Sequence, residues 1–89
     1  MSAHCWVYAL ASLSRPYIYV GITQDLEDRV RRHQGGRERT TKPYRPFEIL
    51  HVEQCPDRAT ARKREQYLKS GQGKEFLYGL LEQKKADHR

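Results

Sequence analysis

Two stretches near the start of the chain alternate between side chains of different character, which is the pattern of β-strands. Residues 4–12 place large apolar side chains on one side of an extended chain and small ones on the other. Residues 17–22 place tyrosines on one side and aliphatic residues, expected to be buried, on the other. The intervening SRP sequence at residues 14–16 is typical of a turn, so the two strands are predicted to form a hairpin.

The next segment has the features of a short amphipathic helix. Thr23 or Asp25 is suited to cap its start, and the two glycines after Gln34 are suited to end it. Leu26 and Val30 form a narrow apolar stripe, and acidic residues precede basic ones, as the helix dipole favours. A helix that ends near Gln34 is therefore predicted.

A polar loop and a third strand are expected next. Residues 35–46 are rich in glycine, proline and basic side chains, a composition that predicts irregular structure. Residues 47–54 alternate cleanly, which predicts a strand with Leu50 and Val52 on the same face.

The C-terminal part of the chain predicts two helices, over residues 56–71 and 73–83, and a charged, frayed tail at residues 82–89. The predicted order is thus β-β-α-β-α-α. Short connections between these elements predict an α+β fold, with a three-stranded, mainly antiparallel sheet flanked by helices. We expect residues 1–89 to form a single domain with its core in residues 4–80.

The charge of the chain indicates a class of partner. The 89 residues carry a formal net charge of +6, and the pI is about 9.6. A domain this basic is expected to meet polyanions, most commonly nucleic acid, although a solvated cationic surface explains the same composition. No segment has the apolar length that a signal peptide or membrane span needs. Cys5 and Cys55 are interpreted as reduced thiols of a cytoplasmic protein, with a disulfide left open.

Three features are unusual for a purely structural sequence. Glu65 shares an arc of its helix with apolar residues, and an inward carboxylate is expected to pair with a cation or bind a metal. Arg29 and His33 are four residues apart on the first helix, so their side chains are neighbours. Tyr8 and Tyr19 are central in adjacent strands. Taken singly, each feature has a structural explanation: a salt bridge, a solvated basic face or core packing.

Taken together and in this order, these residues resemble the GIY-YIG endonuclease family. The sequence YVG at 19–21 is similar to the family's Tyr-Ile-Gly signature, and WVY at 6–8 stands where the family has Gly-Ile-Tyr. The Arg-x-x-x-His helix and the segment ARKREQYLKSGQGKEFL around Glu65 are similar to the family's following helices. The resemblance spans about residues 4–80. It is to the small single-domain members and to the N-terminal nuclease domain of the excision-repair nuclease.

The resemblance implies a DNA endonuclease that hydrolyses phosphodiester bonds with one divalent metal, Mg²⁺ or Mn²⁺, in DNA repair or recombination. The residues that match the family's catalytic motifs are Tyr8, Tyr19, Arg29, His33 and Glu65. Glu65 is the implied protein ligand of the metal, and Gly21 is expected to let the backbone pass close to the site. The catalytic residues are expected to converge on one concave face of the sheet.

The roles of these side chains follow from the charge of the substrate. A phosphodiester gains negative charge when it is attacked, and the planar donors of Arg29 match phosphate oxygens. Tyr8 is the favoured group to orient or deprotonate the attacking water, with help from His33, and Tyr19 is expected to hold water or phosphate. The sequence leaves open which tyrosine is the base.

The basic loop is interpreted as a track for the DNA backbone, formed by Arg37, Arg39, Lys42 and Arg45, with Thr40, Thr41 and Tyr44 as neutral phosphate contacts. A merely solvated loop remains the alternative. The DNA is expected to be branched or damaged, and a partner protein is expected to supply target specificity. Two other interpretations stay open: a nucleic-acid-binding module with weak catalysis, and a protein-interaction domain with an incidental basic surface.

Overall fold

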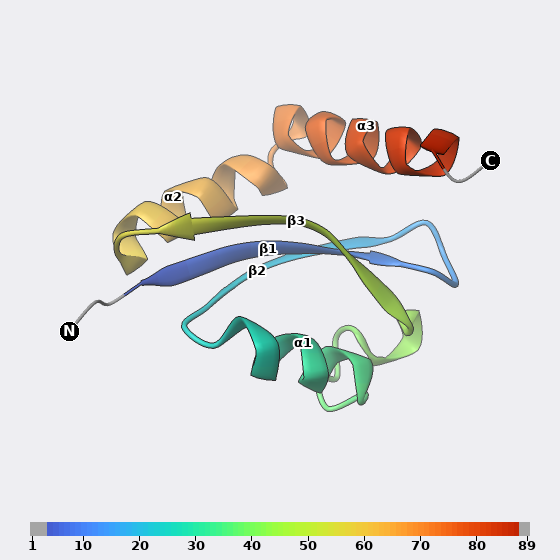
Figure 1. Ribbon diagram of the computed structural model, residues 1–89, viewed down its shortest axis with the longest axis horizontal. Coiled ribbons are helices and arrows are strands. Elements are labelled where there is room, and N and C mark those ends of the chain that lie inside the picture. Colours follow the sequence, from blue (N-terminus) through green and yellow to red (C-terminus); the bar gives the residue numbers. More distant parts are fainter. Residues whose placement is uncertain (1–3, 88–89) are drawn as a thin grey trace.

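The computed structural model describes residues 4–87, which form one three-stranded antiparallel sheet and three helices (Figure 1). The elements are β1 (Cys5–Ser12), β2 (Ile18–Thr23), α1 (Leu26–Gln34), β3 (Phe47–Cys55), α2 (Arg58–Lys69) and α3 (Gly71–Asp87), with a short 3₁₀ turn, η1, at Lys42–Tyr44. The strands lie side by side in the order β2-β1-β3. The predicted α+β class and the predicted order of the elements are confirmed.

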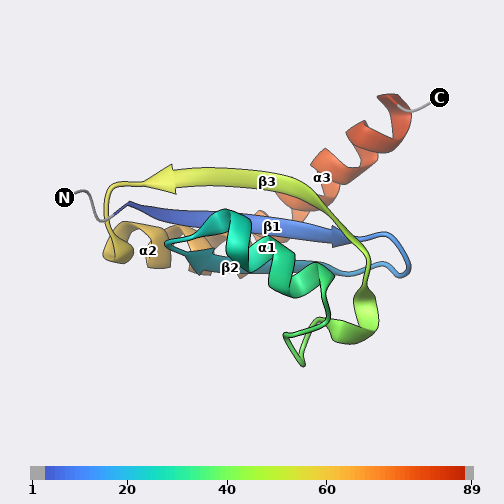
Figure 2. The same ribbon diagram turned by 60° about the horizontal axis from the view of Figure 1, so that its bottom comes forward.

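The helices cover both faces of the sheet: α1 lies on one face, and α2 and α3 lie on the other (Figures 1 and 2). Because successive side chains of a strand point to opposite faces, Val7 and Ala9 pack in the cluster under α2 and α3. Tyr8 and Leu10 pack in the cluster under α1. The predicted sidedness of the first strand is confirmed, and the molecule has a separate apolar cluster on each face.

The larger cluster joins α2 and α3 to the sheet. Ala61 and Leu68 of α2 and Leu77 of α3 are buried there against Val7 and Val20. Full burial of a leucine side chain contributes roughly 1.5–3 kcal/mol. These contacts therefore fix the position of the two C-terminal helices on the sheet.

Side-chain caps set where the helices begin. The carboxylate of Asp25 accepts a hydrogen bond from the Asp28 N–H at 3.1 Å, so Asp25 rather than Thr23 caps α1. The carboxylate of Asp57 accepts one from the Thr60 N–H at 2.7 Å and caps α2. None of the helices in the described part of the chain combines the length and apolar character needed to cross a bilayer.

The prediction of clean alternation in β3 is wrong. The pairing of β1 with β3 shifts between Ala9, which lies opposite His51, and Leu10, which lies opposite Ile49. Leu50 is therefore an extra residue, as in a β-bulge. As a result Leu50 packs in the cluster under α2 and α3, whereas Val52 packs in the cluster under α1.

The prediction of a frayed tail is also wrong for the residues that the structure describes, because α3 continues to Asp87. Lys84 connects this extension to β3. Its ammonium donates to the Glu48 carboxylate at 3.0 Å and to the Ile49 carbonyl oxygen at 3.2 Å. Gly71, expected to end α2, is instead the first residue of α3, and Ser70 separates the two helices. The last two residues of the predicted tail lie outside the described residues.

Candidate active site

Strands β1 and β2 and helix α1 bring two tyrosines and a histidine together on one face of the sheet. The ring centroids are 6.1 Å apart for Tyr8 and Tyr19, 5.8 Å for Tyr8 and His33, and 4.8 Å for Tyr19 and His33. The three side chains come from the central strand, the edge strand and the last turn of α1. Three of the five expected catalytic residues therefore form one contiguous cluster.

A chain of hydrogen bonds runs through this cluster. The Tyr8 hydroxyl lies 2.9 Å from His33 Nε2, and His33 Nδ1 lies 2.8 Å from Thr41 Oγ1. The Thr41 hydroxyl lies 3.4 Å from the Glu38 carbonyl oxygen. Because a carbonyl oxygen can only accept, the hydroxyl is the donor of that bond. Thr41 thus accepts from His33 Nδ1–H, and His33 Nε2 accepts from the Tyr8 O–H. On this basis we assign His33 the neutral tautomer with its proton on Nδ1.

Burial keeps this chain neutral. Tyr8 and Thr41 are fully buried and His33 is 1% exposed. Burial raises the pKa of Tyr8 well above its ordinary value; nearby Tyr19 acts in the same direction, and Arg29 opposes it. Burial lowers the pKa of His33, against the opposing charge of Glu38. Tyr8 is therefore a protonated donor in this structure, and Tyr19, which is half-buried, is the tyrosine of the pair that solvent reaches.

Gly21 lies directly opposite Tyr8 in the sheet, and the space beside it is already filled. A Cβ atom at this position would lie 2.8 Å from the Tyr8 hydroxyl oxygen and 2.9 Å from Cε2 of Tyr19. Both distances are shorter than side chains tolerate. The glycine of the YVG sequence thus gives the two phenol rings room to approach the backbone of the edge strand.

Arg29 supplies a cation at this site. It belongs to α1 and is close enough to Tyr8 to oppose the rise in the pKa of that phenol. Its Nη1 lies 3.4 Å from Oε2 of Glu38. Its Nε atom is buried and has no hydrogen-bond partner among the residues that the structure describes. The side chain as a whole is 36% exposed, so the accessible nitrogens of its guanidinium are suited to an anionic oxygen of a ligand.

The expectation that Glu65 shares the face of Tyr8 is wrong. Glu65 belongs to α2, which covers the opposite face of the sheet, although its side chain is inward, as predicted, at 15% exposed. Its carboxylate accepts a hydrogen bond from the Lys69 ammonium at 3.1 Å. A helical wheel shows which side of a helix is inward, but not which face of the sheet the helix will cover.

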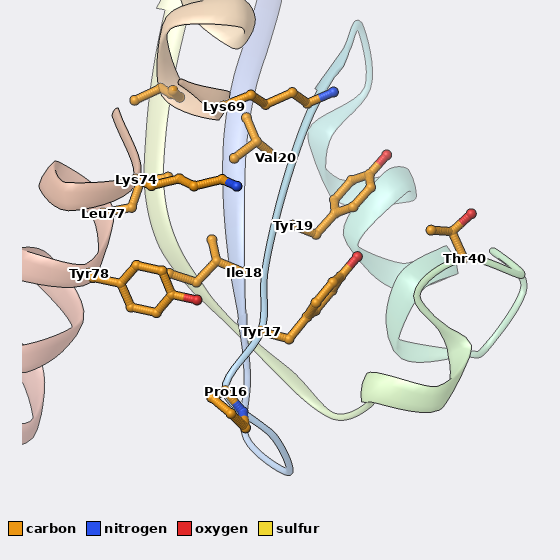
Figure 3. Close-up of a pocket in the computed structure, with 11 residues that line it drawn as sticks. Pro16, Tyr17, Ile18, Tyr19, Val20, Thr40, Lys69, Lys74, Leu77 and Tyr78 are labelled. Atoms are coloured by element: carbon orange, nitrogen blue, oxygen red, sulfur yellow. The ribbon is translucent and has the colours of Figure 1, made fainter. Parts of the chain in front are cut away.

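Edge strand β2 is the boundary between the two faces, and a groove connects them there. Lys69, the partner of Glu65, lines the same groove as Tyr19 (Figure 3). Within residues 4–87, no group of three or more His, Cys, Asp or Glu side chains is placed to hold a metal ion. A single carboxylate such as Glu65 fits Mg²⁺ or Mn²⁺, which keep several waters and take phosphate oxygens, and does not fit zinc.

The loop that follows α1 gathers part of the expected DNA track. Three of its basic side chains are exposed and line one open hollow next to α1: Arg39, Lys42 and Arg45. Arg37 is exposed but is not among the residues that line the hollow. Thr41, expected to contact phosphate, is instead buried on His33, and Tyr44 stacks on Tyr17 with ring centroids 3.8 Å apart.

Sequence reasoning missed two residues at the site. Glu38 is the only acidic residue of the basic loop, and its carboxylate lies 3.4 Å from Arg29 and 3.6 Å from Arg32. A single acidic residue among basic ones indicates an ion pair, and this pattern was visible in the sequence. Gln34 exchanges two hydrogen bonds with the backbone of Phe47, at 2.7 and 2.8 Å, and so fixes the end of α1 to the start of β3. No sequence pattern indicated this contact.

Comparisons with known proteins agree with the fold and with the motifs. A profile of the GIY-YIG catalytic domain matches residues 4–78. The solution NMR structure of a UPF0213 protein from Bacillus halodurans resembles this chain with a TM-score of 0.53 and 28% sequence identity. The alignment covers 86% of this chain and 84% of that one. A search of curated proteins gave no significant match.

Proposed function

This chain belongs to the family of GIY-YIG catalytic domains, and from that premise we propose that it hydrolyses phosphodiester bonds of DNA with the help of a divalent metal ion. The observation that carries the proposal is the partly exposed Arg29 guanidinium beside the Tyr8–His33 hydrogen bond. A cation next to hydroxyl groups suits a reacting group that is anionic and gains negative charge. We further propose a role in DNA repair or recombination.

Arg29 is proposed to hold the scissile phosphate. In the free protein its Nη1 faces the Glu38 carboxylate, while its Nε has no partner among the described residues. Phosphate oxygens can reach the exposed part of the guanidinium and compete with Glu38 for its Nη1. Glu38 thereby keeps Arg29 ordered until the substrate binds.

The two tyrosines have different proposed roles because they differ in burial. Tyr19 is half-buried, so its hydroxyl is suited to orient the attacking water, whose oxygen forms a new bond to phosphorus while the P–O3′ bond breaks. Tyr8 is buried and neutral and donates to His33. We propose that Tyr8 and His33 position Tyr19 and Arg29. When DNA changes their surroundings, the proton of the attacking water passes to the Tyr8 oxygen while Tyr8 gives its own proton to His33 Nε2.

Glu65 is the proposed ligand for Mg²⁺ or Mn²⁺. A bound metal would neutralise charge on the phosphate and on the departing 3′ oxygen. The ion pair with Lys69 orders the carboxylate, and Lys69 lines the groove that also contains Tyr19. We therefore propose that the Glu65 carboxylate of α2 and the Tyr19 hydroxyl act on the same phosphate group at the edge of β2.

Strand cleavage in plasmid and branched DNA tests the proposal. We expect cleavage with Mg²⁺ or Mn²⁺ and none with EDTA. We expect Arg29→Ala to reduce the rate by about 10²–10³-fold, the usual loss when a donor to transition-state charge is removed. Arg31→Ala is the matched control, because Arg31 lies on the same helix but is exposed to solvent, and it should cut at close to the wild-type rate.

Glu65→Gln separates the metal role from a structural one. This change keeps the size of the side chain and removes its charge, so cleavage should fall by orders of magnitude while DNA binding persists. If Glu65 only pairs with Lys69, the melting temperature should fall and the cleavage rate should hold. A Glu65→Gln protein that cuts at the wild-type rate in Mg²⁺ would refute the metal role.

A second candidate function is DNA binding without useful turnover. Two observations favour it: Tyr8 is fully buried, and the helix that carries Glu65 covers the opposite face of the sheet. On this alternative, DNA binds with an affinity that Arg29→Ala lowers, and no metal ion produces cleavage. The same cleavage assay, run beside a binding titration, distinguishes the two functions.

A further inference from the structure

A groove of about 390 Å³ runs along the outer edge of β2 (Figure 3). Strand β2 is at the edge of the sheet, so no other strand of the described chain covers it. Tyr17 and Tyr19 line the groove on the α1 side, and Lys74 and Tyr78 of α3 line it on the other side. The volume lies within the range of small-ligand sites, roughly 300–1,000 Å³.

The lining of this groove combines aromatic and cationic side chains with five apolar ones. It contains three tyrosines and two lysines, and no carboxylate is among the lining residues. Tyr78 is 42% exposed, and Lys74 is exposed and forms no ion pair within residues 4–87. The groove therefore contains both an ammonium group that is unpaired among the described residues, that of Lys74, and an exposed aromatic ring, that of Tyr78.

One wall of the groove is the end of an existing stack. The Tyr17 ring lies parallel to the Tyr44 ring, with centroids 3.8 Å apart and an interplanar angle of 12°. The Arg15 guanidinium covers Tyr44, 5.7 Å from the centre of the ring. Tyr17 also lines the groove, so this stack of aromatic rings borders it.

We propose that this groove binds an unpaired nucleotide of DNA, so that the substrates of the enzyme carry a single-stranded segment beside the bond that is cut. This inference rests on the proposed nuclease function. Proteins that bind single strands stack bases on aromatic side chains and contact the backbone phosphates with basic ones. A base inside a duplex is already paired and stacked, and its ring faces are not available to the tyrosines.

Tyr19 connects the groove to the proposed chemistry. It lines the groove, and its ring lies 4.8 Å from that of His33. A nucleotide held between β2 and α3 therefore lies next to the proposed catalytic residues. The edge of β2 would also accept an extended peptide. The net charge of +6 and the absence of a carboxylate from the lining favour the polyanion.

Binding of labelled oligonucleotides in EDTA tests the groove independently of cleavage. We compare a single-stranded oligothymidine with a blunt hairpin duplex by fluorescence anisotropy. Tyr78→Ala should weaken single-strand binding about 5- to 150-fold, the range expected for the loss of one stacked base. Lys74→Gln should weaken it too, and neither change should alter duplex binding more than about twofold.

The controls are Tyr67→Ala and Lys63→Gln, which remove an exposed tyrosine and an exposed lysine of α2 that do not line the groove. Both should bind like the wild type. Groove variants that keep full single-strand affinity, or that lose single-strand and duplex affinity equally, overturn the inference. Lys74→Gln changes only an exposed side chain and provides the test if Tyr78→Ala does not fold.

The inference and the nuclease proposal can fail separately. A wild-type protein that binds single strands through the groove but does not cut with Mg²⁺ or Mn²⁺ refutes the nuclease proposal and keeps the nucleotide site. A protein that cuts blunt duplex as fast as a flap, with Tyr78→Ala cutting both at the wild-type rate, refutes the groove and keeps the nuclease.

Discussion

At the scale of single residues, the buried chain from Tyr8 through His33 to Thr41 is the most informative feature of the site. Both nitrogens of the His33 ring have partners, at 2.9 and 2.8 Å, and all three side chains are buried. A partner removed from such a chain leaves a polar atom without water and without a hydrogen bond. The chain therefore links the stability of the fold to the geometry of the proposed active site.

Thr41→Val tests this link, because valine has nearly the same shape as threonine but cannot accept the hydrogen bond from His33 Nδ1. We expect a loss of about 1–3 kcal/mol in the free energy of unfolding, measured with urea. We also expect lower cleavage, since the His33 ring loses its orientation. Thr40→Val is the control for stability alone, because Thr40 is exposed but lines the groove beside Tyr19. Equal stability of the two variants would contradict the role of Thr41.

The pH dependence of stability provides a second test of this chain. Burial lowers the pKa of His33 in the folded protein below the 6.5 of an exposed histidine. Between these two pKa values the unfolded chain binds a proton at His33 and the folded protein does not. The contribution of neutral His33 is therefore complete above about pH 6.5 and is lost as the pH falls through the lowered pKa. His33→Gln should show a flatter stability curve below pH 6.5 in urea titrations. An unchanged curve would mean that His33 is not the titrating group.

The sequence predicted the members of this site better than their contacts. Tyr8, Tyr19 and His33 were assigned to a site by the family resemblance. Their common face follows from strand alternation and helical spacing, which depend only on neighbouring residues. Thr41 was assigned to phosphate instead of to His33, because its contact with His33 depends on the path of an irregular loop. The position of Glu65 was missed for a related reason: which face of the sheet α2 covers depends on the whole chain.

At the scale of secondary-structure elements, the junction between α2 and α3 depends on one glycine. Gly73 is buried, and a Cβ atom there would collide with the Tyr67 carbonyl oxygen and the Leu68 Cα atom. Gly73→Ala should destabilise the fold by about 1–3 kcal/mol or more, since backbone atoms cannot turn aside. Gly79→Ala in the same helix meets nothing within 4 Å and should stabilise the fold by about 0.5–1 kcal/mol. Urea unfolding should show opposite signs for the two variants.

A second element-scale contact joins β3 to α2. The Glu53 carboxylate accepts two hydrogen bonds from Arg64, at 2.7 and 2.8 Å, and lies 2.8 Å from His51 Nε2. The hydrogen bonds from Arg64 lower the pKa of Glu53 from 4.5 to about 2, against an opposing effect of burial. A group whose pKa is lowered on folding stabilises the fold above its unfolded pKa. This contribution should therefore be present above about pH 4.5 and be lost as the pH falls toward 2.

Glu53→Gln tests this contact. The variant should lose about 1 kcal/mol at pH 7, a modest value because the pair is partly exposed, and it should lose less than the wild type on acidification from pH 5 to pH 2. Glu27→Gln changes an exposed glutamate and is the control. If acid weakens the Glu53→Gln protein as steeply as the wild type, other carboxylates dominate the acid transition.

At the scale of the whole molecule, part of the charge excess lies beside the proposed catalytic residues. The chain has 17 Lys and Arg against 11 Asp and Glu. Arg39, Lys42 and Arg45 surround one hollow beside α1, on the face that also carries the Tyr8–His33 cluster. The phosphates of a bound strand therefore have a basic surface that begins next to the proposed catalytic residues. DNA binding should weaken as salt rises and should show little sequence preference.

Fluorescence anisotropy across a salt series tests this surface quantitatively. Each phosphate contact contributes roughly 0.9 to the slope of log affinity against log salt concentration. Replacement of Arg39, Lys42 and Arg45 together by glutamine should thus reduce the slope by about three if all three contact phosphates. The matched control replaces Arg58, Arg62 and Lys63, which are exposed on α2 across the sheet. That triple variant has the same net charge but should keep a slope close to that of the wild type. Equal losses of slope in both variants would mean that net charge, not the loop surface, determines binding. An affinity that does not change with salt would rule out phosphate contacts altogether.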